Sequence, residues 1–290
     1  MIIFTILFLI LLIILILLID YLVFRQITTP NVLINNKNNI SDKKIVLLKT
    51  HIWTDDLEKF AIKLKNETLI HGIDFFILMH SNNNKLINKI KNEELKKYIL
   101  MFNENDIKKM YVKGFYSMWL SNHWILMWFY KKYKHKYKYF WTIEYDVRIS
   151  GDSSKIWTYS GTEDFIYPIE IFQDPNWGFK NYYIGNKLTD NDKYYGYLQL
   201  ARYSNKFLEY LNQCYTSGEN GQDELITFSL FKRANMLGHL TGTKDPLNKL
   251  IKNSWSVSGN DSDKHKKLLE ESETEYKSNI NHVRIFHPIK

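Results

Sequence analysis

The stretch that most constrains the fold runs from Tyr139 to Asp152 and joins a buried strand to a pair of acids. Tyr139–Ile143 is aromatic and β-branched, which is the composition of a strand buried on both faces. Glu144 and Asp146 follow at a spacing of two, so their side chains point to the same side of an extended chain. Ligands of open α/β sheets bind at the carboxyl ends of strands. Two carboxylates there can hold a hard divalent cation, which in turn holds a diphosphate.

An acidic junction between a strand and a surface loop would show the same residue pattern, and acid-x-acid pairs are common by chance. The hydrophobic strand before the pair and the Ser150–Asp152 turn after it favour the metal site.

The N-terminus predicts a membrane anchor. Met1–Ile19 contains no charged side chain, and about 20 apolar residues can span a bilayer as a helix. A cleaved signal peptide would have a basic start, a shorter apolar core and a small-residue cleavage site, and none of these is visible. We therefore expect an uncleaved single-pass anchor over residues 1–24, followed by a polar stem over 25–43 that is rich in Asn.

The sidedness of this anchor stays open. The basic residues follow the apolar run, so the positive-inside rule would leave the body in the cytosol. Long domains can be translocated regardless, and three Asn-x-Ser/Thr triplets would be glycosylation acceptors in a lumen, as in an endomembrane or Golgi protein.

The rest of the chain, 44–290, predicts one α/β domain. Apolar residues make up 45% of the 290, enough for a sizeable core, and the one cysteine excludes an intrachain disulfide. Strands over 44–50 and 73–80 alternate with helices over 55–65 and 85–100, the signature of a parallel sheet with covering helices. Later we expect helices over 117–133, 153–159, 197–215 and 226–236, strands over 164–169 and 283–286, and a poorly patterned polar region over 241–280.

A net charge of +8 suits anionic partners such as phosphates, nucleic acid or lipid headgroups. The most basic segment, Lys131–Lys138, interleaves lysines with aromatic residues, a pattern found in nucleic-acid binding. It would lie at the opposite end of the next strand from the acids, which favours a solvated loop. We expect no nucleic-acid partner.

Three further places carry candidate chemistry. Asp223 and Glu224 precede an apolar helix, where an acid can cap the helix or act as a base, and the two acids could divide these roles. Trp177 lies in an aromatic loop over 173–186, of the kind that lines sugar or nucleotide sites or fills a core. His287 in the apolar tail could supply a metal ligand or lie on the surface.

Taken together, the chain resembles a glycosyltransferase of the GT-A type. The shared features are the apolar anchor, the stem, the βαβ start, Phe-Trp-Thr-Ile-Glu-Tyr-Asp-Val-Arg, the later acidic loop and the closing Phe-His-Pro-Ile-Lys. The resemblance implies a Rossmann-type mixed, mostly parallel sheet flanked by helices. It also implies transfer of a sugar from a nucleotide-sugar donor, with a UDP-sugar expected, to a hydroxyl of a glycan, protein or lipid acceptor. Mn²⁺ or Mg²⁺ would bridge the diphosphate.

By this resemblance Asp146 is the principal metal ligand, Glu144 supports it and His287 completes the site, while Asp223 or Glu224 is the base. The substrate-binding set is Glu144, Asp146, Arg148, Trp177 and Lys290. The first acid of the motif is Glu where the family usually has Asp. Two other classes stay open: an inactive membrane-tethered binding protein of the same fold, and a metal-dependent phosphoesterase.

Overall fold

The computed structural model describes residues 43–80, 85–251, 254–256, 258–278 and 282–290. The predicted anchor and all but the last residue of the predicted stem lie outside these ranges. Among the helices of the described ranges, none combines the length and the apolar character that crossing a bilayer requires.

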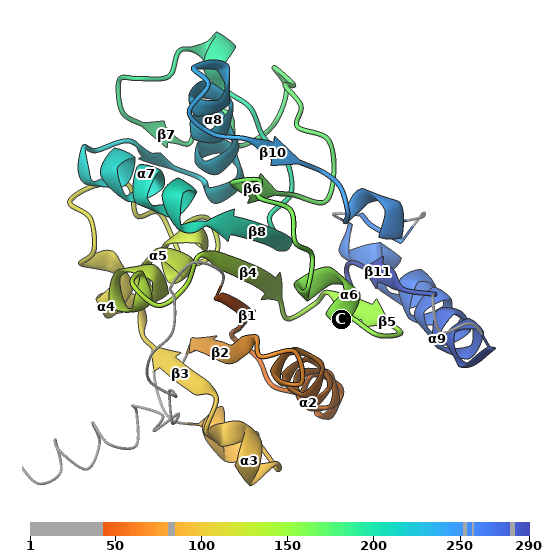
Figure 1. Cartoon of the computed structure of the whole chain (residues 1–290). Coiled ribbons are helices and arrows are strands. Elements are labelled where there is room, and N and C mark those ends of the chain that lie inside the picture. Colours follow the sequence, from red (N-terminus) through yellow and green to blue (C-terminus); the bar gives the residue numbers. More distant parts are fainter. Residues whose placement is uncertain (1–42, 81–84, 252–253, 257, 279–281) are drawn as a thin grey trace, which may run out of the picture.

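A seven-stranded sheet forms the centre of the domain, in the order β10-β6-β8-β4-β1-β2-β3 (Figure 1). Strands β4, β1, β2 and β3 are parallel to one another, whereas β8 runs antiparallel to both of its neighbours, β4 and β6. The sheet is therefore mixed and mostly parallel, as predicted. In sheet order the strands are β10 (Gly242–Thr243), β6 (Phe165–Ile166), β8 (Leu200–Ser204), β4 (Tyr139–Glu144), β1 (Lys44–Thr50), β2 (Asp74–His80) and β3 (Ile99–Phe102).

Two hydrophobic cores cover the two faces of this sheet. Because side chains alternate along a strand, Ile45 and Leu47 enter one core while Val46 and Leu48 enter the other. The first core is closed by α4 (Glu104–Lys108), α5 (His123–Tyr133), α7 (Asn205–Thr216) and α8 (Asp223–Met236). The second is closed by α2 (Asp55–Leu69), α3 (Glu93–Lys96) and α6 (Ser154–Trp157). Figure 1 shows α5, α7 and α8 on one side of the sheet and α2 on the other.

Two small antiparallel sheets bring distant segments to the central one. β5 (Arg148–Ser150) pairs with β11 (Arg284–Phe286), so the C-terminal tail lies beside the chain that leaves β4. β7 (Tyr183–Ile184) pairs with β9 (Asn220–Gly221), so the aromatic loop lies beside the start of α8. The remaining elements are α9 (Ser262–Ser278), which packs beside β5, and the 3₁₀ turns η1 (Ile87–Lys89), η2 (Asp190–Asp192), η3 (Asn248–Leu250) and η4 (Gly259–Asp261).

The predicted helix over 85–100 is wrong. That segment contains η1, α3 and then β3, which adds to the edge of the sheet with Ile99 opposite Ile77 of β2. The charged residues before β3 have helical propensity, but the apolar Ile99–Phe102 run gains more by pairing with a buried strand.

The predicted helix over 197–215 is wrong in its first part for a related reason. Leu200–Ser204 forms β8, which fills the space between β4 and β6 and is buried throughout. Only then does α7 begin, capped by Ser204, whose Oγ accepts the Phe207 N–H at 2.9 Å. The helix expected over 117–133 likewise begins only at His123, and the polar region over 241–280 contains α9.

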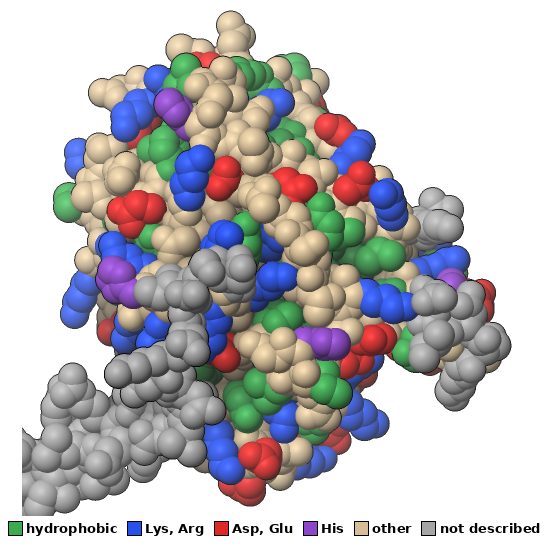
Figure 2. Space-filling model, in the orientation of Figure 1, with side chains coloured by type: hydrophobic (Ala, Val, Ile, Leu, Met, Phe, Trp, Pro, Cys, Tyr) green, Lys and Arg blue, Asp and Glu red, His purple; other side chains and the backbone are tan. Residues whose placement is uncertain are grey.

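Charged side chains of both signs are interspersed over the face that Figure 2 shows, so the net charge of +8 does not produce a field of a single sign there.

Candidate active site at the end of β4

Glu144 is the last residue of β4, and the chain turns immediately after it. The Val147 N–H donates to the Glu144 carbonyl at 3.1 Å, which places Tyr145 and Asp146 in the turn. The extended alternation on which the prediction of two parallel carboxylates relied therefore ends at Glu144. The two acids instead face different partners on adjacent sides of the turn.

Glu144 is held by two donors. Its Oε1 lies 3.2 Å from Lys49 Nζ and accepts a hydrogen bond of 2.6 Å from Asn122 Nδ2. Lys49 stands opposite Glu144 in the register of β1 and β4, so sheet pairing itself brings the ammonium to the carboxylate. Lys49 is buried, which makes this an ion pair in a region of low dielectric constant.

Asp146 faces His287 of the C-terminal tail. His287 Nε2 lies 3.7 Å from Asp146 Oδ1, which is too long for a hydrogen bond, and both residues are buried. Among the described residues, none is a hydrogen-bond partner of Asp146 Oδ1. His287 Nδ1 lies 2.7 Å from the Ser256 carbonyl, which can only accept, so Nδ1 carries the proton and a neutral ring leaves the Nε2 lone pair facing Asp146.

The electrostatics of Asp146 follow from this setting. Burial, followed by the charge of Glu144, raises the pKa of Asp146, whereas the charges of Lys290 and of His287, when its ring is protonated, act in the opposite direction. A carboxylate that is costly to ionise in the absence of a counter-charge is a carboxylate that a cation would stabilise.

This donor set fits a divalent cation that also binds substrate. A buried carboxylate oxygen without a donor and an imidazole lone pair 3.7 Å away can both ligate Mn²⁺ or Mg²⁺. Mg²⁺ sites commonly use one or two protein ligands and take the rest from phosphates and water. In the described part of the chain, no group of three or more His, Cys, Asp or Glu side chains is placed to hold a metal. Such a cation would therefore depend on a bound diphosphate.

Asp223 and Glu224 begin α8, and both are close enough to Glu144 to interact with its charge. The capping role falls to Gln222, whose side-chain oxygen accepts the Leu225 N–H at 2.8 Å. Asp223 Oδ1 accepts from Gln222 Nε2 at 2.7 Å and from the Glu224 N–H at 2.8 Å. Glu224 Oε1 accepts from Gln199 Nε2 at 3.1 Å.

These two acids carry raised pKa values. Burial, followed by the negative charge of Glu144, raises the pKa of Asp223 to about 7, although the Lys49 ammonium opposes this. Burial and the charge of Asp223 raise the pKa of Glu224 well above its ordinary range. Buried acids that repel one another beside a strand end are typical of catalytic sites.

The other three predicted residues have partners of their own. Arg148 is buried, bonds Asp56 through Nε at 3.0 Å, and donates to the carbonyls of Tyr145 and Val147, so it supports the turn. Trp177 stacks on Tyr195 in the aromatic loop. Lys290 is exposed, and its backbone N–H donates to Ser262 Oγ at 2.8 Å. The charge of its side chain lowers the pKa of Asp146.

Sequence reasoning missed Lys49, Asn122 and Gln199. A lysine inside the apolar run of a predicted buried strand is a signal that could have identified Lys49, because an unpaired ammonium is rarely buried. Asn122 and Gln199 lie outside regular helices and strands and carry no comparable signal.

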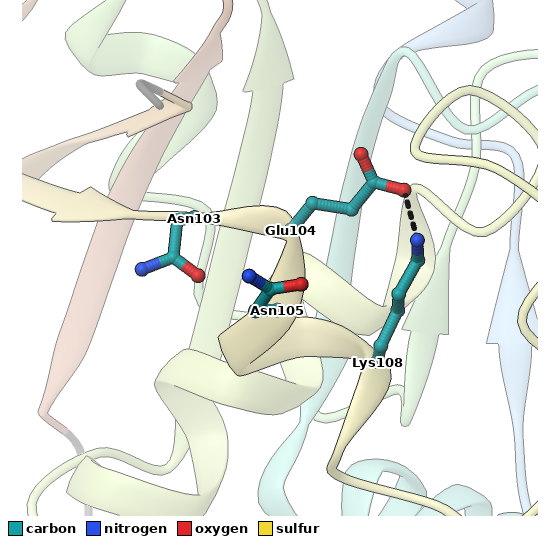
Figure 3. Close-up of a pocket in the computed structure, with 4 residues that line it drawn as sticks. All are labelled: Asn103, Glu104, Asn105 and Lys108. Carbon is teal, nitrogen blue, oxygen red and sulfur yellow. Dashed lines mark ion pairs between the residues drawn. The ribbon is translucent and has the colours of Figure 1, made fainter. Parts of the chain in front are cut away.

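A separate pocket lies at the start of α4, after the carboxyl end of β3, and is lined by Asn103, Glu104, Asn105 and Lys108 (Figure 3). Glu104 and Lys108 point toward one another across one helical turn and form an ion pair of 2.8 Å. None of the acids at the end of β4 contributes to the lining of this pocket.

No protein-family model and no curated protein matches the sequence. Among solved structures, the chain is similar to a glycosyltransferase involved in the glycosylation of the major capsid of PBCV-1, with a TM-score of 0.29, 13% identity, and coverage of 59% of this chain. The match spans 63% of that enzyme, less than two thirds of its length. It is also similar to the inositol-1-phosphate CTP transferase from T. maritima, with a TM-score of 0.40, 9% identity, and coverage of 71% of this chain and 86% of that one. A third is HddC from Yersinia pseudotuberculosis, with a TM-score of 0.33, 12% identity, and coverage of 67% and 99%.

Proposed function

We propose that this protein is a glycosyltransferase of the GT-A type that moves a sugar from a nucleotide-diphosphate sugar to an acceptor hydroxyl. The observation that carries the proposal is the pair Asp146 and His287 at the carboxyl end of β4. A buried carboxylate oxygen, to which no described residue donates a hydrogen bond, faces an imidazole lone pair at 3.7 Å. In a mostly parallel sheet, this is the edge where ligands bind.

Asp146 and His287 would hold Mn²⁺ or Mg²⁺, with Glu144 contributing its charge from the anchored position beside Lys49. When bound, the cation stabilises the negative charge that develops on the departing diphosphate. Ser256 fixes the tautomer of His287 through its carbonyl, and Arg148 fixes the turn that carries Asp146. Lys290 adds a positive charge at the same edge.

Asp223 is the preferred base. A pKa of about 7 suits a group that must be ionised at neutral pH and still accept a proton from the acceptor hydroxyl as it attacks. Gln222 and the Glu224 N–H hold its Oδ1, which orients the carboxylate. Glu224 lies next to it with a pKa raised well above its ordinary range, and in its protonated form it would not oppose the charge of Asp223.

The test is the Asp146→Asn variant, assayed for UDP-sugar turnover and for Mn²⁺-dependent UDP binding. We expect a loss of ~100-fold or more in metal-dependent binding, abolished turnover, and a nearly unchanged melting temperature, since the charge removed was costly to bury. His287→Ala should show the same defect more weakly.

Asp164→Asn is the matched control, because Asp164 is also buried but accepts from Ser204 Oγ at 2.8 Å and from the Thr241 N–H at 3.0 Å. That variant should lose stability and keep UDP binding. If Asp146→Asn binds Mn²⁺ and UDP as the parent does, the transferase proposal is wrong. A parent that binds both without turnover would instead be an inactive binding protein, and a metal-dependent phosphoesterase would cleave phosphate esters in place of the glycosidic bond.

We further propose that residues 1–24 anchor the enzyme in a membrane, with 25–43 as a stem and 44–290 as the catalytic domain. The support is the uncharged Met1–Ile19 run. Carbonate extraction of the full-length protein should leave it in the membrane fraction, and release into the soluble fraction would contradict the anchor.

A further inference from the structure

Beside Asp223 and Glu224 lies a connected surface of aromatic rings that the proposed chemistry does not use. Trp119 and Tyr182 are 70% and 37% exposed, respectively. Phe179 joins them, with its ring centroid 5.4 Å from that of Trp119 and 5.7 Å from that of Tyr182, both in edge-to-face geometry. We call this set, together with Tyr116 and Trp177, the aromatic platform.

The platform is fixed in place by packing. Trp177 stacks on the buried Tyr195 at 4.2 Å between ring centroids with planes 8° apart, and its ring also meets Phe179 at 5.3 Å. Tyr116 meets Tyr182 at 5.3 Å. Edge-to-face and stacked ring pairs are favourable beyond the area that they bury. Where these contacts hold Trp177, Phe179 and Tyr182, a ligand that binds has little side-chain freedom to remove.

Backbone hydrogen bonds tie the platform to the acids at the start of α8. The Asp223 N–H donates to the carbonyl of Leu120, the residue after Trp119, at 2.9 Å. The Gln222 N–H donates to the Tyr182 carbonyl at 2.8 Å. Gly221 permits this approach, because a Cβ there would lie 2.6 Å from the Tyr182 oxygen. The exposed Trp119 is thus the sequence neighbour of Leu120, whose carbonyl contacts Asp223, the preferred base.

We propose that the aromatic platform binds the acceptor, and that this acceptor is a neutral oligosaccharide. Sugar rings present apolar C–H faces that pack on aromatic faces, and amides bond their hydroxyls. The same loop exposes three amide side chains, those of Asn176, Asn181 and Asn186. The charge of Asp223, the preferred base beside the platform, disfavours an anionic ligand. This inference rests on the proposed function, because it takes the bound sugar to present a hydroxyl toward the base. The binding of the sugar can be measured without turnover.

The experiment is isothermal titration of the full-length protein with chitotriose, cellotriose and maltotriose, and separately with UDP and Mn²⁺. The variants are Trp119→Ala and, as a matched control, Leu237→Ala, since Leu237 at the far end of α8 is 62% exposed. At least one trisaccharide should bind the parent and Leu237→Ala equally, and Trp119→Ala should weaken that binding by ~10-fold, while UDP binding is equal in all three. Trp119→Tyr should restore part of the affinity.

The inference would be overturned if no trisaccharide binds a parent that binds UDP, or if Trp119→Ala binds the trisaccharide as the parent does. A change in oligomeric state of Trp119→Ala, measured by light scattering, would also overturn it, because the platform would then be an interface between copies of the chain. Trisaccharide binding without UDP binding would support the platform and contradict the transferase proposal, so the two failures are distinguishable.

Discussion

Glu58 and Asp223 both lie in the first turns of helices, α2 and α8, and are buried to the same degree, at 6% and 7% exposed. Their pKa values nevertheless move in opposite directions. Burial would raise the pKa of Glu58, but hydrogen bonds from Trp53, Lys91 and Asn92 outweigh it and lower the pKa. Burial and the charge of Glu144 raise that of Asp223 to about 7.

The difference lies in what surrounds each carboxylate. Glu58 accepts three hydrogen bonds: from Trp53 Nε1 at 3.0 Å, from the Lys91 N–H at 3.1 Å and from the Asn92 N–H at 2.6 Å. Asp223 has two other acids nearby, and Lys49, the cation that most affects it, already pairs with Glu144. Burial by itself therefore does not mark a catalytic acid. A buried acid with like-charged neighbours is the better candidate.

Among the changes that separate Asp223 from Glu58, the largest effect should come from Asp223→Asn. If Asp223 is the base, the amide removes proton acceptance and keeps the size of the side chain, so turnover should fall by about 10²–10⁴-fold. The melting temperature should stay the same or rise, since the ionised carboxylate is costly in this setting. Sugar-transfer assays and thermal melts of the same preparation give both quantities. Turnover within 10-fold of the parent would move the search for the base to Glu224, through Glu224→Gln.

Glu58→Gln should do the reverse. The amide places an NH₂ group against donors and leaves at least one of them unpaired, so the free energy of unfolding should fall by about 1–3 kcal/mol. Turnover at a temperature where the variant is folded should match the parent. Denaturant unfolding measures the first quantity, and a stability equal to that of the parent would mean that the hydrogen bonds to Glu58 matter little.

The pH dependence of stability should separate the two acids. Glu58 has a lowered folded-state pKa, so its contribution is present above the unfolded pKa and is lost as the pH falls below about 4. The folded-state pKa of Asp223 is raised instead. Between the ordinary aspartate pKa and about 7, the folded state therefore binds more protons than the unfolded state, and stability falls as the pH rises. Asp223→Asn should therefore flatten the unfolding free energy between pH 4 and 7. Glu58→Gln should flatten it only at the acidic end.

The smallest effect concerns Lys49, whose charge lowers the pKa of Asp223. In Lys49→Met the acidic limb of the pH–rate profile should move to higher pH than in the parent, because Asp223 loses a stabilising cation. Lys244→Met is a suitable control, since Lys244 pairs with the exposed Glu170 away from the acids. If the acidic limb of Lys49→Met lies at the same pH as that of the parent, Lys49 does not affect the pKa of the base.

Local sequence patterns predicted the elements that hold the acids but not the geometry between them. The Lys44–Thr50 and Tyr139–Glu144 runs are apolar enough that only buried strands accommodate them, and both were predicted from composition. β3 and β8 were not predicted because their residues are also compatible with a helix. They form strands only because a neighbouring strand supplies hydrogen-bond partners.

The sequence by itself determined that this chain carries an apolar N-terminal run, an α/β domain, and acids at a strand end and at a helix start. Only the tertiary structure decided which of those acids have partners. Lys49 meets Glu144 through strand register, and the tail histidine meets Asp146 through the pairing of β5 with β11, where Ser150 and Arg284 lie 134 positions apart in the chain. The physical reason is that burial and like charge depend on distances across the fold, and local sequence patterns do not encode those distances.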